Sequence, residues 1–327
     1  MPEPLLKVSN LSTYFYTYAG ITKAVDDVSF SVENGEIIGI VGESGCGKSV
    51  MARSILRIIP DPPGRIVNGE VFFGGNDLLR LSEEEMQKIR GNHISMIFQE
   101  PMTSLNPVYT VGNQLSEVFR YHQGCNQREA LENSVKLLRM VGMPSPETRV
   151  KDYPFQMSGG MRQRVVIAMA LACKPKILLA DEPTTALDVT IQAQVLDMVR
   201  QLQEELKTSM ILITHDLGVI AEIVKRVLVM YAGKFVEEAG VEELFNGPLH
   251  PYTQGLMESI PTLDSDQTRH TGKLREIAGV VPDLSRLPAG CSFSPRCPRV
   301  MNICHTEEPQ LLQAGLNHSV RCWLYAQ

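Results

Sequence analysis

The chain has 327 residues, of which 43% are hydrophobic and 21% are charged, and its formal net charge at pH 7 is -6. Such a composition is typical of a soluble globular protein with about two domains, and it argues against a disordered or fibrous chain. The acidic balance provides no general attraction to nucleic acid or to an anionic membrane surface, so it gives no support for nucleic-acid binding.

Membrane-spanning and secretory segments are not expected. The best apolar run, residues 165–173, is much shorter than the roughly 18 uninterrupted apolar residues of a membrane-spanning helix. The amino terminus, MPEPLLKVSN, lacks the basic and apolar regions of a secretory signal. We therefore expect the chain in the cytoplasm, where its cysteines are reduced.

Strand-like runs open the chain. Residues 28–32 and 36–41 are apolar enough to form strands, and they flank Asn34 and Gly35. Because an Asn-Gly pair favours a two-residue turn, we expect a tight β-hairpin here.

A glycine-rich segment follows the second of these strands. Residues 42–49 read GESGCGKS and fit the phosphate-binding pattern GxxxxGK[ST] between a strand and a helix. In such a loop the backbone N–H groups surround a polyphosphate, Lys48 contacts the β- and γ-phosphates, and the Ser49 hydroxyl ligates Mg²⁺. The segment predicts a site for ATP or GTP.

The middle of the chain has helical periodicity. Apolar residues fall on two stripes at helical spacing, formed by Val111, Leu115, Val118 and Phe119, and by Leu131, Val135, Leu138 and Val141. We expect an inserted helical subdomain at about residues 105–173.

Short apolar runs on either side of the helical segment predict buried parallel strands. They lie at residues 94–98, 176–180, 210–214 and 227–230. Residues 190–207 have helical spacing, so the connection between two of these strands is a crossover helix. The expected fold is a doubly wound α/β P-loop NTPase over residues 1–240, with an antiparallel β subdomain, followed by a small cysteine-rich domain over residues 241–327.

Two carboxylates follow the apolar run at residues 176–180. A phosphate loop needs a carboxylate to organise Mg²⁺ and a second group to activate water. Asp181 and Glu182 stand where a parallel strand ends at the ligand-binding edge of an open sheet. Asp181 is predicted to hold Mg²⁺, directly or through water, and Glu182 to act as the general base or to polarise the attacking water.

The segment between the two nucleotide motifs carries a family resemblance. Residues 157–163 read MSGGMRQ, which resembles the LSGGQ signature of ABC-transporter ATPases. Gln99, the ALD triplet at residues 186–188 and His215 match further motifs of that family in the same order. The resemblance covers about residues 5–240 and implies an ABC ATPase fold that binds ATP.

The resemblance also implies roles for individual residues. Ser158, Gly159 and Gly160 would hold the γ-phosphate of an ATP bound to Lys48 of a partner subunit, in a head-to-tail dimer with two sandwiched nucleotides. The other implied ATP contacts are Gly42, Ser44, Gly45, Cys46, Gly47, Lys48, Ser49 and Val50.

Further implied roles lie outside the two phosphate-binding segments. His215 would contact the γ-phosphate, Gln99 would sense Mg²⁺ and the attacking water, and Asp188 would connect the two sites across the dimer. Mg²⁺ would be held by Ser49, Gln99 and Asp181, and Phe15 would stack on adenine. The signature departs from its usual form at Met161, where the family usually has Gln.

The carboxy-terminal segment resembles one subfamily. Residues 247–253 (GPLHPYT) and 290–298 (GCSFSPRCP) are similar to the extension of ATPases that drive oligopeptide, dipeptide and nickel uptake. The resemblance, strongest to the dipeptide importers, implies an ATP-hydrolysing motor subunit peripheral to the cytoplasmic face of the membrane. Implied partners are a second ATPase subunit, two transmembrane permeases and an extracytoplasmic binding protein. The alternatives are nickel import and a soluble ABC ATPase acting on nucleic acid or translation.

Four cysteines lie close together in this extension. Cys291, Cys297, Cys304 and Cys322 form a complete four-thiolate set for Zn²⁺ or a [4Fe–4S] cluster. The missing short C-x₂₋₄-C spacing favours the cluster over zinc. The same cysteines could instead be small buried hydrophobic residues.

Overall fold

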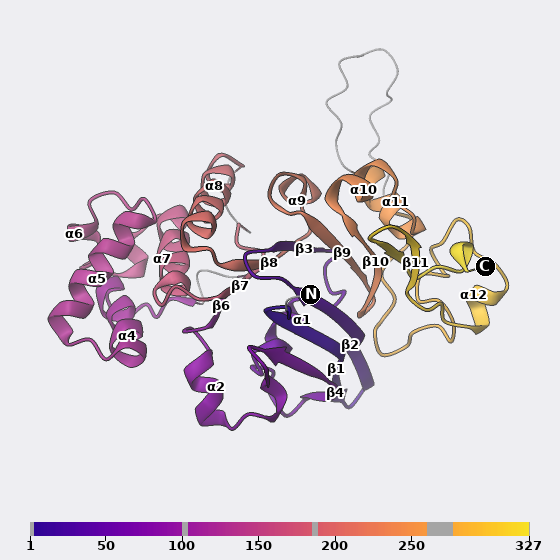
Figure 1. Ribbon diagram of the computed structural model, residues 1–327, viewed down its shortest axis with the longest axis horizontal. Helices are drawn as coiled ribbons and strands as arrows, with labels where there is room; N and C mark the ends of the chain where they lie inside the picture. Colours follow the sequence, from indigo (N-terminus) through magenta and orange to yellow (C-terminus); the bar gives the residue numbers. More distant parts are fainter. Residues whose placement is uncertain (1–2, 100–103, 185–188, 260–276, 327) are drawn as a thin grey trace, which may run out of the picture. The chain divides into compact units, whose positions relative to one another are not determined.

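The computed structural model describes residues 3–99, 104–184, 189–259 and 277–326. Its internal contacts divide the chain into two compact units, each built from separate stretches of sequence. Figure 1 shows the helices and strands, coloured along the sequence. The first unit comprises Met1–Leu5, Val32–Glu36 and Arg80–Leu212, and the second comprises Leu6–Ser31, Ile37–Leu79 and Ile213–Gln327.

An antiparallel sheet forms the amino-terminal part of the second unit. Its strand order is β2-β1-β4-β5, with bounds β1 Leu6–Thr17, β2 Gly20–Val32, β4 Gly64–Phe73 and β5 Asn76–Asp77. β1 and β4 pair from Leu6 opposite Phe73 to Phe15 opposite Gly64, with an irregularity between Ser9 and Ser12. The expected antiparallel β subdomain is therefore present.

A second set of strands in this unit follows the phosphate-binding motif. β3 (Ile37–Val41) pairs in parallel with β9 (Arg226–Tyr231), and β10 (Lys234–Gly240) continues antiparallel to β9. β12 (His318–Val320) pairs with β10, and β11 (Leu312–Gly315) pairs with β12. The end of the chain thus extends the same row of strands as β3.

Short helices complete the second unit. They are α1 Lys48–Ile55, α9 Leu217–Ile223, α10 Val241–Asn246, α11 Pro251–Glu258 and α12 Ile303–Thr306, with 3₁₀ turns at Leu78–Arg80 and Trp323–Tyr325. α11 begins as its sequence dictates: the His250 side chain accepts a hydrogen bond from the Tyr252 N–H, and Pro251 occupies the first helical position, where it needs no N–H partner.

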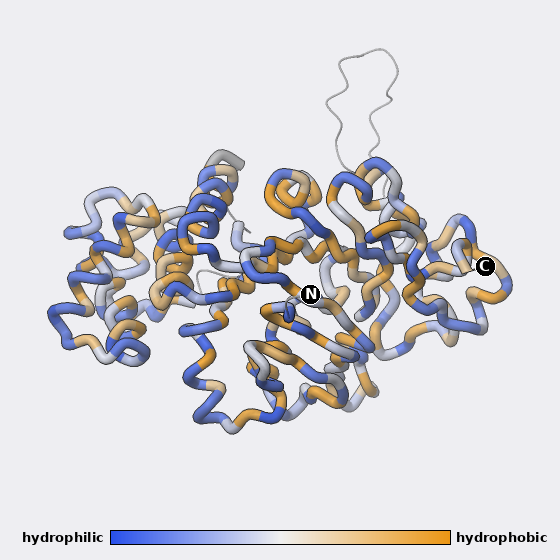
Figure 2. The backbone as a smooth tube through the Cα atoms, viewed as in Figure 1, coloured by the Kyte–Doolittle hydropathy of each residue, from blue (hydrophilic) through white to orange (hydrophobic). Residues whose placement is uncertain are grey.

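The first unit contains buried parallel strands at the positions that the apolar runs predict. β6 (Ile94–Ile97) pairs in parallel with β7 (Ile177–Asp181), and β8 (Ser209–Thr214) lies next to β7 in the strand order. Every residue of these three strands is buried. Figure 2 shows these strands mainly in the hydrophobic colour, whereas hydrophobic and hydrophilic residues are mixed along α8 (Val189–Leu206).

The remaining helices of the first unit are α2 Glu83–Ile89, α4 Val111–Gln123, α5 Gln127–Met140, α6 Pro146–Arg149 and α7 Gly159–Leu171, with a 3₁₀ turn at Pro154–Gln156. All of them except α2 lie where helical periodicity predicts helices. The first predicted stripe faces the core through Val111, Leu115 and Phe119. The second stripe is wrong at one edge: Leu131 is 40% exposed, and Ala130 takes the buried position. The buried face of this helix therefore passes through Ala130, and Leu131 lies at its solvent-exposed edge.

The predicted hairpin at Asn34 and Gly35 is wrong. β2 and β3 belong to different sheets, so the turn carries the chain from one sheet to the other. A type I′ hairpin needs positive φ at both central residues, and only Gly35 has it, with φ 74°. Ser209 holds this turn, because its hydroxyl accepts from the Gly35 N–H at 2.7 Å and donates to the Glu33 carbonyl at 3.1 Å.

Within the described residues, no helix combines the length and the apolar character needed to cross a membrane.

Candidate functional site

The glycine-rich loop joins β3 to α1 in the second unit, and its backbone requires two of its glycines. Gly47 precedes α1 with φ 109°, and a Cβ atom there would lie 2.1 Å from the Ala24 carbonyl oxygen. A Cβ atom on Gly42 would lie 2.2 Å from the Met230 carbonyl oxygen. No other residue fits either position, so the packing of neighbouring strands fixes the motif.

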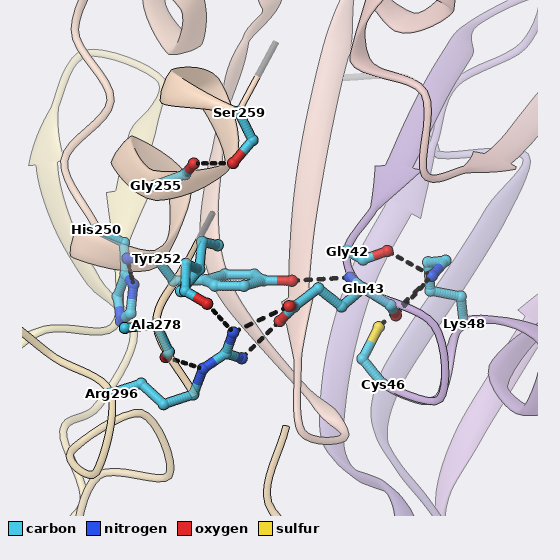
Figure 3. A network of polar contacts seen from close by, with 11 residues as sticks. Gly42, Glu43, Cys46, Lys48, His250, Tyr252, Gly255, Ser259, Ala278 and Arg296 are labelled. Atoms are coloured by element: carbon cyan, nitrogen blue, oxygen red, sulfur yellow. Dashed lines mark hydrogen bonds and ion pairs between the residues drawn. The ribbon is translucent and has the colours of Figure 1, made fainter. Parts of the chain in front are cut away.

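The lysine of the loop points back into it. Lys48 is 4% exposed, and its ammonium group donates to the carbonyl oxygens of Gly42 at 2.7 Å and Glu43 at 3.0 Å (Figure 3). Cys46 is buried beside it, and burial raises the pKa of its thiol, so this cysteine is a neutral packing residue. Ser44 and Gly45 form the exposed tip, and Ser49 and Val50 are in the first turn of α1.

This arrangement places a cation and a helix amino terminus at one loop. The first backbone N–H groups of a helix have no partner within the helix and attract anions. The loop therefore has the charge and the donors that a polyphosphate requires.

The second unit also holds two other predicted site residues. His215 is exposed directly after β8, and the following Asp216 caps α9 by accepting from the N–H groups of Gly218 and Val219. Phe15 lies on β1 opposite Gly64, and a Cβ on Gly64 would approach its ring to 2.8 Å. The ring of Phe15 thus has a packing contact on one side.

Two of the predicted catalytic side chains meet in the first unit. Asp181 ends β7 with its side chain fully buried, and Glu182 follows with φ 48°. Positive φ is uncommon for a glutamate, and such backbone strain concentrates at functional sites. The Gln99 Nε2 atom donates to the Glu182 carboxylate at 2.9 Å, which orients that carboxylate.

The signature segment forms the start of α7. The Ser158 side chain caps this helix by accepting from the Met161 N–H at 3.3 Å, and Gly159 and Gly160 occupy its first turn. A Cβ on Gly160 would lie 3.0 Å from Ile191, so a larger residue would press on α8. The signature thus presents the amino terminus of a 13-residue helix, which is an anion-attracting position. Asp188, with the rest of residues 185–188, lies outside the described residues.

Gln163 makes a contact near the site that the sequence did not predict. Its side chain is buried in α7 and donates to the carbonyl of Pro183, the residue after Glu182. This bond ties the signature helix to the strained end of β7. A buried amide in an apolar helical stretch was the available signal, because such groups require a partner.

The four tail cysteines come near one another, but the structure does not arrange them as a ready-made metal site. All seven cysteines are free, and across the described ranges no group of three or more His, Cys, Asp or Glu residues is arranged to hold a metal ion. Burial raises the pKa of Cys291 to about 11, and the neighbouring Cys304, Cys322 and Cys297 add to the shift. The Cys291 N–H donates to the Cys304 carbonyl at 2.9 Å. The iron–sulfur expectation is therefore not confirmed.

Comparisons with known proteins place these features in a family. The ABC transporter family matches residues 25–185, and the family described as oligopeptide/dipeptide transporter, C-terminal region, matches residues 236–304. The chain is 52% identical over 319 residues to the probable peptide ABC transporter ATP-binding protein y4tR of Sinorhizobium fredii, covering 98% of this chain and 94% of the relative. It is 51% identical over 323 residues to the oligopeptide transport ATP-binding protein AppD of Bacillus subtilis, covering 99% and 97%.

A solved structure agrees with the fold. The dimeric post-hydrolysis state of the ATP-binding cassette MJ0796, bound to ADP and Pi, matches with a TM-score of 0.64 and 28% identity, covering 72% of this chain and 98% of that one. The glycine-rich loop, the Gln99–Glu182 contact and the signature helix are thus parts of an ATPase cassette. The chain belongs to the ABC-transporter ATP-binding proteins and carries the carboxy-terminal region of the oligopeptide and dipeptide transporters.

Proposed function

We propose that this chain is the ATP-hydrolysing motor subunit of an importer for dipeptides or longer peptides. The observation that carries the proposal is the buried Lys48 ammonium inside a glycine loop at the start of α1, because this site suits a nucleotide polyphosphate. The peptide substrate is taken from relatives whose names describe peptide and oligopeptide transport.

Mg²⁺ would be held by oxygen atoms of Ser49, Gln99 and Asp181. Mg²⁺ prefers oxygen ligands, and the buried Asp181 carboxylate fits that preference. Because the Gln99 Nε2 atom donates to Glu182, the amide oxygen is the Gln99 atom suited to the metal. The ion would neutralise charge on the β- and γ-phosphates.

Hydrolysis would depend on Glu182 and His215. Glu182, held by Gln99, would accept a proton from the attacking water, and His215 would hydrogen-bond the γ-phosphate. Phe15 is proposed to stack on adenine.

The working form would be a dimer of ATPase subunits. Ser158, Gly159 and Gly160 would contact the nucleotide of the partner subunit, because they form a helix amino terminus. Asp188 would couple the two sites. We propose a related chain as the partner, two permeases on the membrane side, a binding protein outside, and a peripheral position at the cytoplasmic face.

The domain division is also a proposal. The cassette would span residues 1–240 with its helical subdomain at about 105–173, and the extension residues 241–327. Nickel import and action on nucleic acid or translation are not favoured, since the relatives' names describe peptides.

ATP binding and turnover test the motor role. The purified chain is expected to bind ATP in the presence of Mg²⁺, and Lys48→Ala should weaken binding by about 100-fold, a loss that matches removal of a charge-assisted contact. In cells, deletion of the gene should abolish growth on peptides as a nitrogen source without changing nickel uptake. The reverse pattern would assign the chain to nickel transport.

The tail cysteines support a second, separate proposal. We propose that Cys291, Cys297, Cys304 and Cys322 bind a [4Fe–4S] cluster, or alternatively Zn²⁺. Burial, with smaller contributions from the neighbouring cysteines, raises the pKa of the Cys291, Cys297 and Cys322 thiols, which indicates that the four residues lie in one partly buried cluster. Raised thiol pKa values mean that metal binding would release protons. Such a site would brace the tail structurally.

Metal and sulfide analysis of protein purified without oxygen distinguishes the possibilities. About four iron atoms and four sulfides per chain, lost in Cys297→Ser, would establish the cluster. One zinc atom per chain would replace it with a zinc site, and absence of both would leave four packing cysteines, of which Cys304 and Cys322 are buried.

A further inference from the structure

Two residues of the carboxy-terminal extension contact the phosphate-binding loop within the second unit. They are Tyr252 at the start of α11 and Arg296 in the segment before α12, and both reach the same loop residue, Glu43 (Figure 3). Both lie inside the two stretches that resemble the peptide-importer extension. The extension thus contacts the site that holds Lys48.

Tyr252 holds the backbone of Glu43. Its hydroxyl accepts from the Glu43 N–H at 2.8 Å, and its ring is fully buried. The ring packs at 4.6 Å from Tyr231 and 5.6 Å from Phe293, measured between ring centroids. This aromatic cluster fixes the hydroxyl, since a buried tyrosine cannot swing without displacing both neighbours.

Arg296 holds the side chain of Glu43. Its two terminal nitrogens pair with the two carboxylate oxygens at 2.7 and 3.0 Å, which is the bidentate geometry of the strongest charge-assisted contacts. The arginine side chain is only 3% exposed, whereas that of Glu43 is 30% exposed. The arginine is therefore the buried partner of this ion pair.

The guanidinium group is fixed from all sides. Its Nε atom donates to the Ala278 carbonyl at 3.0 Å, and a terminal nitrogen donates to the Ile277 carbonyl at 3.3 Å. The group also lies over the rings of Tyr231 and Phe293, at 5.8 and 5.9 Å. An arginine placed in this way cannot follow Glu43 if the loop moves, so it limits the positions that the loop can take.

The constraint reaches the nucleotide lysine through one residue. The N–H group of Glu43 donates to Tyr252, and its carboxylate pairs with Arg296. The carbonyl oxygen of the same residue accepts from the Lys48 ammonium group at 3.0 Å. On the opposite side of the loop, the Cys46 carbonyl accepts from the Gly233 N–H at 2.9 Å. A loop held at both sides is preorganised, so less ordering is required when phosphate binds.

We propose that Arg296 and Tyr252 are positioning residues for ATP, through which the carboxy-terminal extension sets the nucleotide affinity of the phosphate-binding loop. Neither side chain contacts the reacting atoms; both act through Glu43. The proposal rests on the proposed ATP-binding function of this loop.

The test measures the dissociation constant for a fluorescent ATP analogue, with Mg²⁺, on the full chain. Arg296→Lys keeps the charge but loses the bidentate geometry, and Tyr252→Phe keeps the ring but loses the bond to Glu43. We expect the dissociation constant to rise by about tenfold in Arg296→Lys and by about threefold in Tyr252→Phe. These factors correspond to the loss of a charged and of a neutral hydrogen bond, respectively.

Matched controls come from the same extension. Arg321 is buried and donates to the carbonyls of Phe235 and Pro309, and Tyr325 donates to that of Leu249, all away from the loop. Arg321→Lys and Tyr325→Phe should lower the unfolding temperature comparably but leave ATP affinity unchanged.

The outcomes are distinct. If the wild-type chain does not bind ATP, the proposed function fails. If it binds ATP and the Arg296 and Tyr252 variants bind as tightly as their controls, or if the controls lose as much affinity, the positioning role is overturned. A Glu43→Ala, Arg296→Lys double variant should lose no more affinity than Glu43→Ala alone, because both changes break the same contact.

Discussion

The phosphate-binding loop and the cysteine tail both concentrate chemically distinctive residues, yet they differ in how the fold uses them. The loop is eight consecutive residues whose geometry depends on backbone angles and on strands packed against Gly42 and Gly47. The cysteines are spread over residues 291–322, and in the described part of the chain they are not arranged as a ready-made metal site. A contiguous backbone motif specifies its own geometry, whereas a dispersed ligand set needs tertiary packing, or the metal itself, to assemble.

The comparison also shows what the tail does besides carrying cysteines. Its buried Arg296 and Tyr252 hold Glu43 of the loop. The segments that resemble the peptide-importer extension thus include residues that contact the nucleotide loop directly.

The largest expected effect separates chemistry from binding. Glu182→Gln keeps the size of the side chain but removes the base, so turnover of ATP should fall by about 10²- to 10⁴-fold while ATP still binds. Steady-state ATPase rates and the binding assay check this. Unchanged turnover would remove Glu182 from the catalytic role.

A pair of glycine variants compares the loop with the tail. Both glycines are tightly packed, so both variants should lose stability, but their effects on ATP affinity should differ. A Cβ on Gly290 would lie 2.4 Å from the Cys304 carbonyl, much as one on Gly47 meets Ala24. Gly47→Ala and Gly290→Ala should each lower the free energy of unfolding by about 2–3 kcal/mol, because the backbone must shift. Chemical denaturation measures both.

The Gly47 variant should also lose more ATP affinity than the Gly290 variant. Gly290 is in the extension and contacts the backbone near Cys304, away from the loop. Equal affinity losses in the two variants would mean that any distortion of the second unit disturbs the site, and would weaken the contrast between loop and tail.

A further prediction concerns the acid stability of the tail. Burial lowers the pKa of His250 from 6.5 to about 3, so the folded protein keeps this ring neutral where the unfolded chain takes up a proton. The contribution of the neutral His250 ring to the free energy of unfolding is complete above pH 6.5. As the pH falls toward 3, this contribution decreases by up to about 1.4 kcal/mol per pH unit.

His250→Asn keeps a capping side chain that does not titrate. Between pH 6.5 and 5 the free energy of unfolding of this variant should fall less steeply than that of the wild type. Denaturant titrations at several pH values measure how the free energy of unfolding depends on pH in both proteins. The same pH dependence in wild type and variant would contradict the lowered pKa of His250.

Much of the cassette could be predicted from the sequence. The short strands β6, β7 and β8 appear where apolar runs predicted them, because a strand buried on both faces needs apolar residues at every position. The helices of residues 105–173 follow from their periodicity.

Predictions failed where a local signal depended on distant packing. The Asn34-Gly35 pair predicted a hairpin, but the buried strands on either side are drawn into different sheets. Leu131 was predicted to belong to the buried stripe of its helix but lies at the exposed edge. The segments that pack against a helix decide which of its residues are buried.

The sequence by itself determined the phosphate-binding loop, the signature helix and the family, because these depend on neighbouring residues and on backbone groups that glycine leaves free. Only the tertiary structure decided that Gln99 orients Glu182, that Gln163 ties α7 to Pro183, and that Arg296 and Tyr252 hold Glu43. These contacts join residues 20 to 253 positions apart in the chain. No local pattern encodes them, because a side-chain hydrogen bond is specified by where two segments pack rather than by the residues beside it.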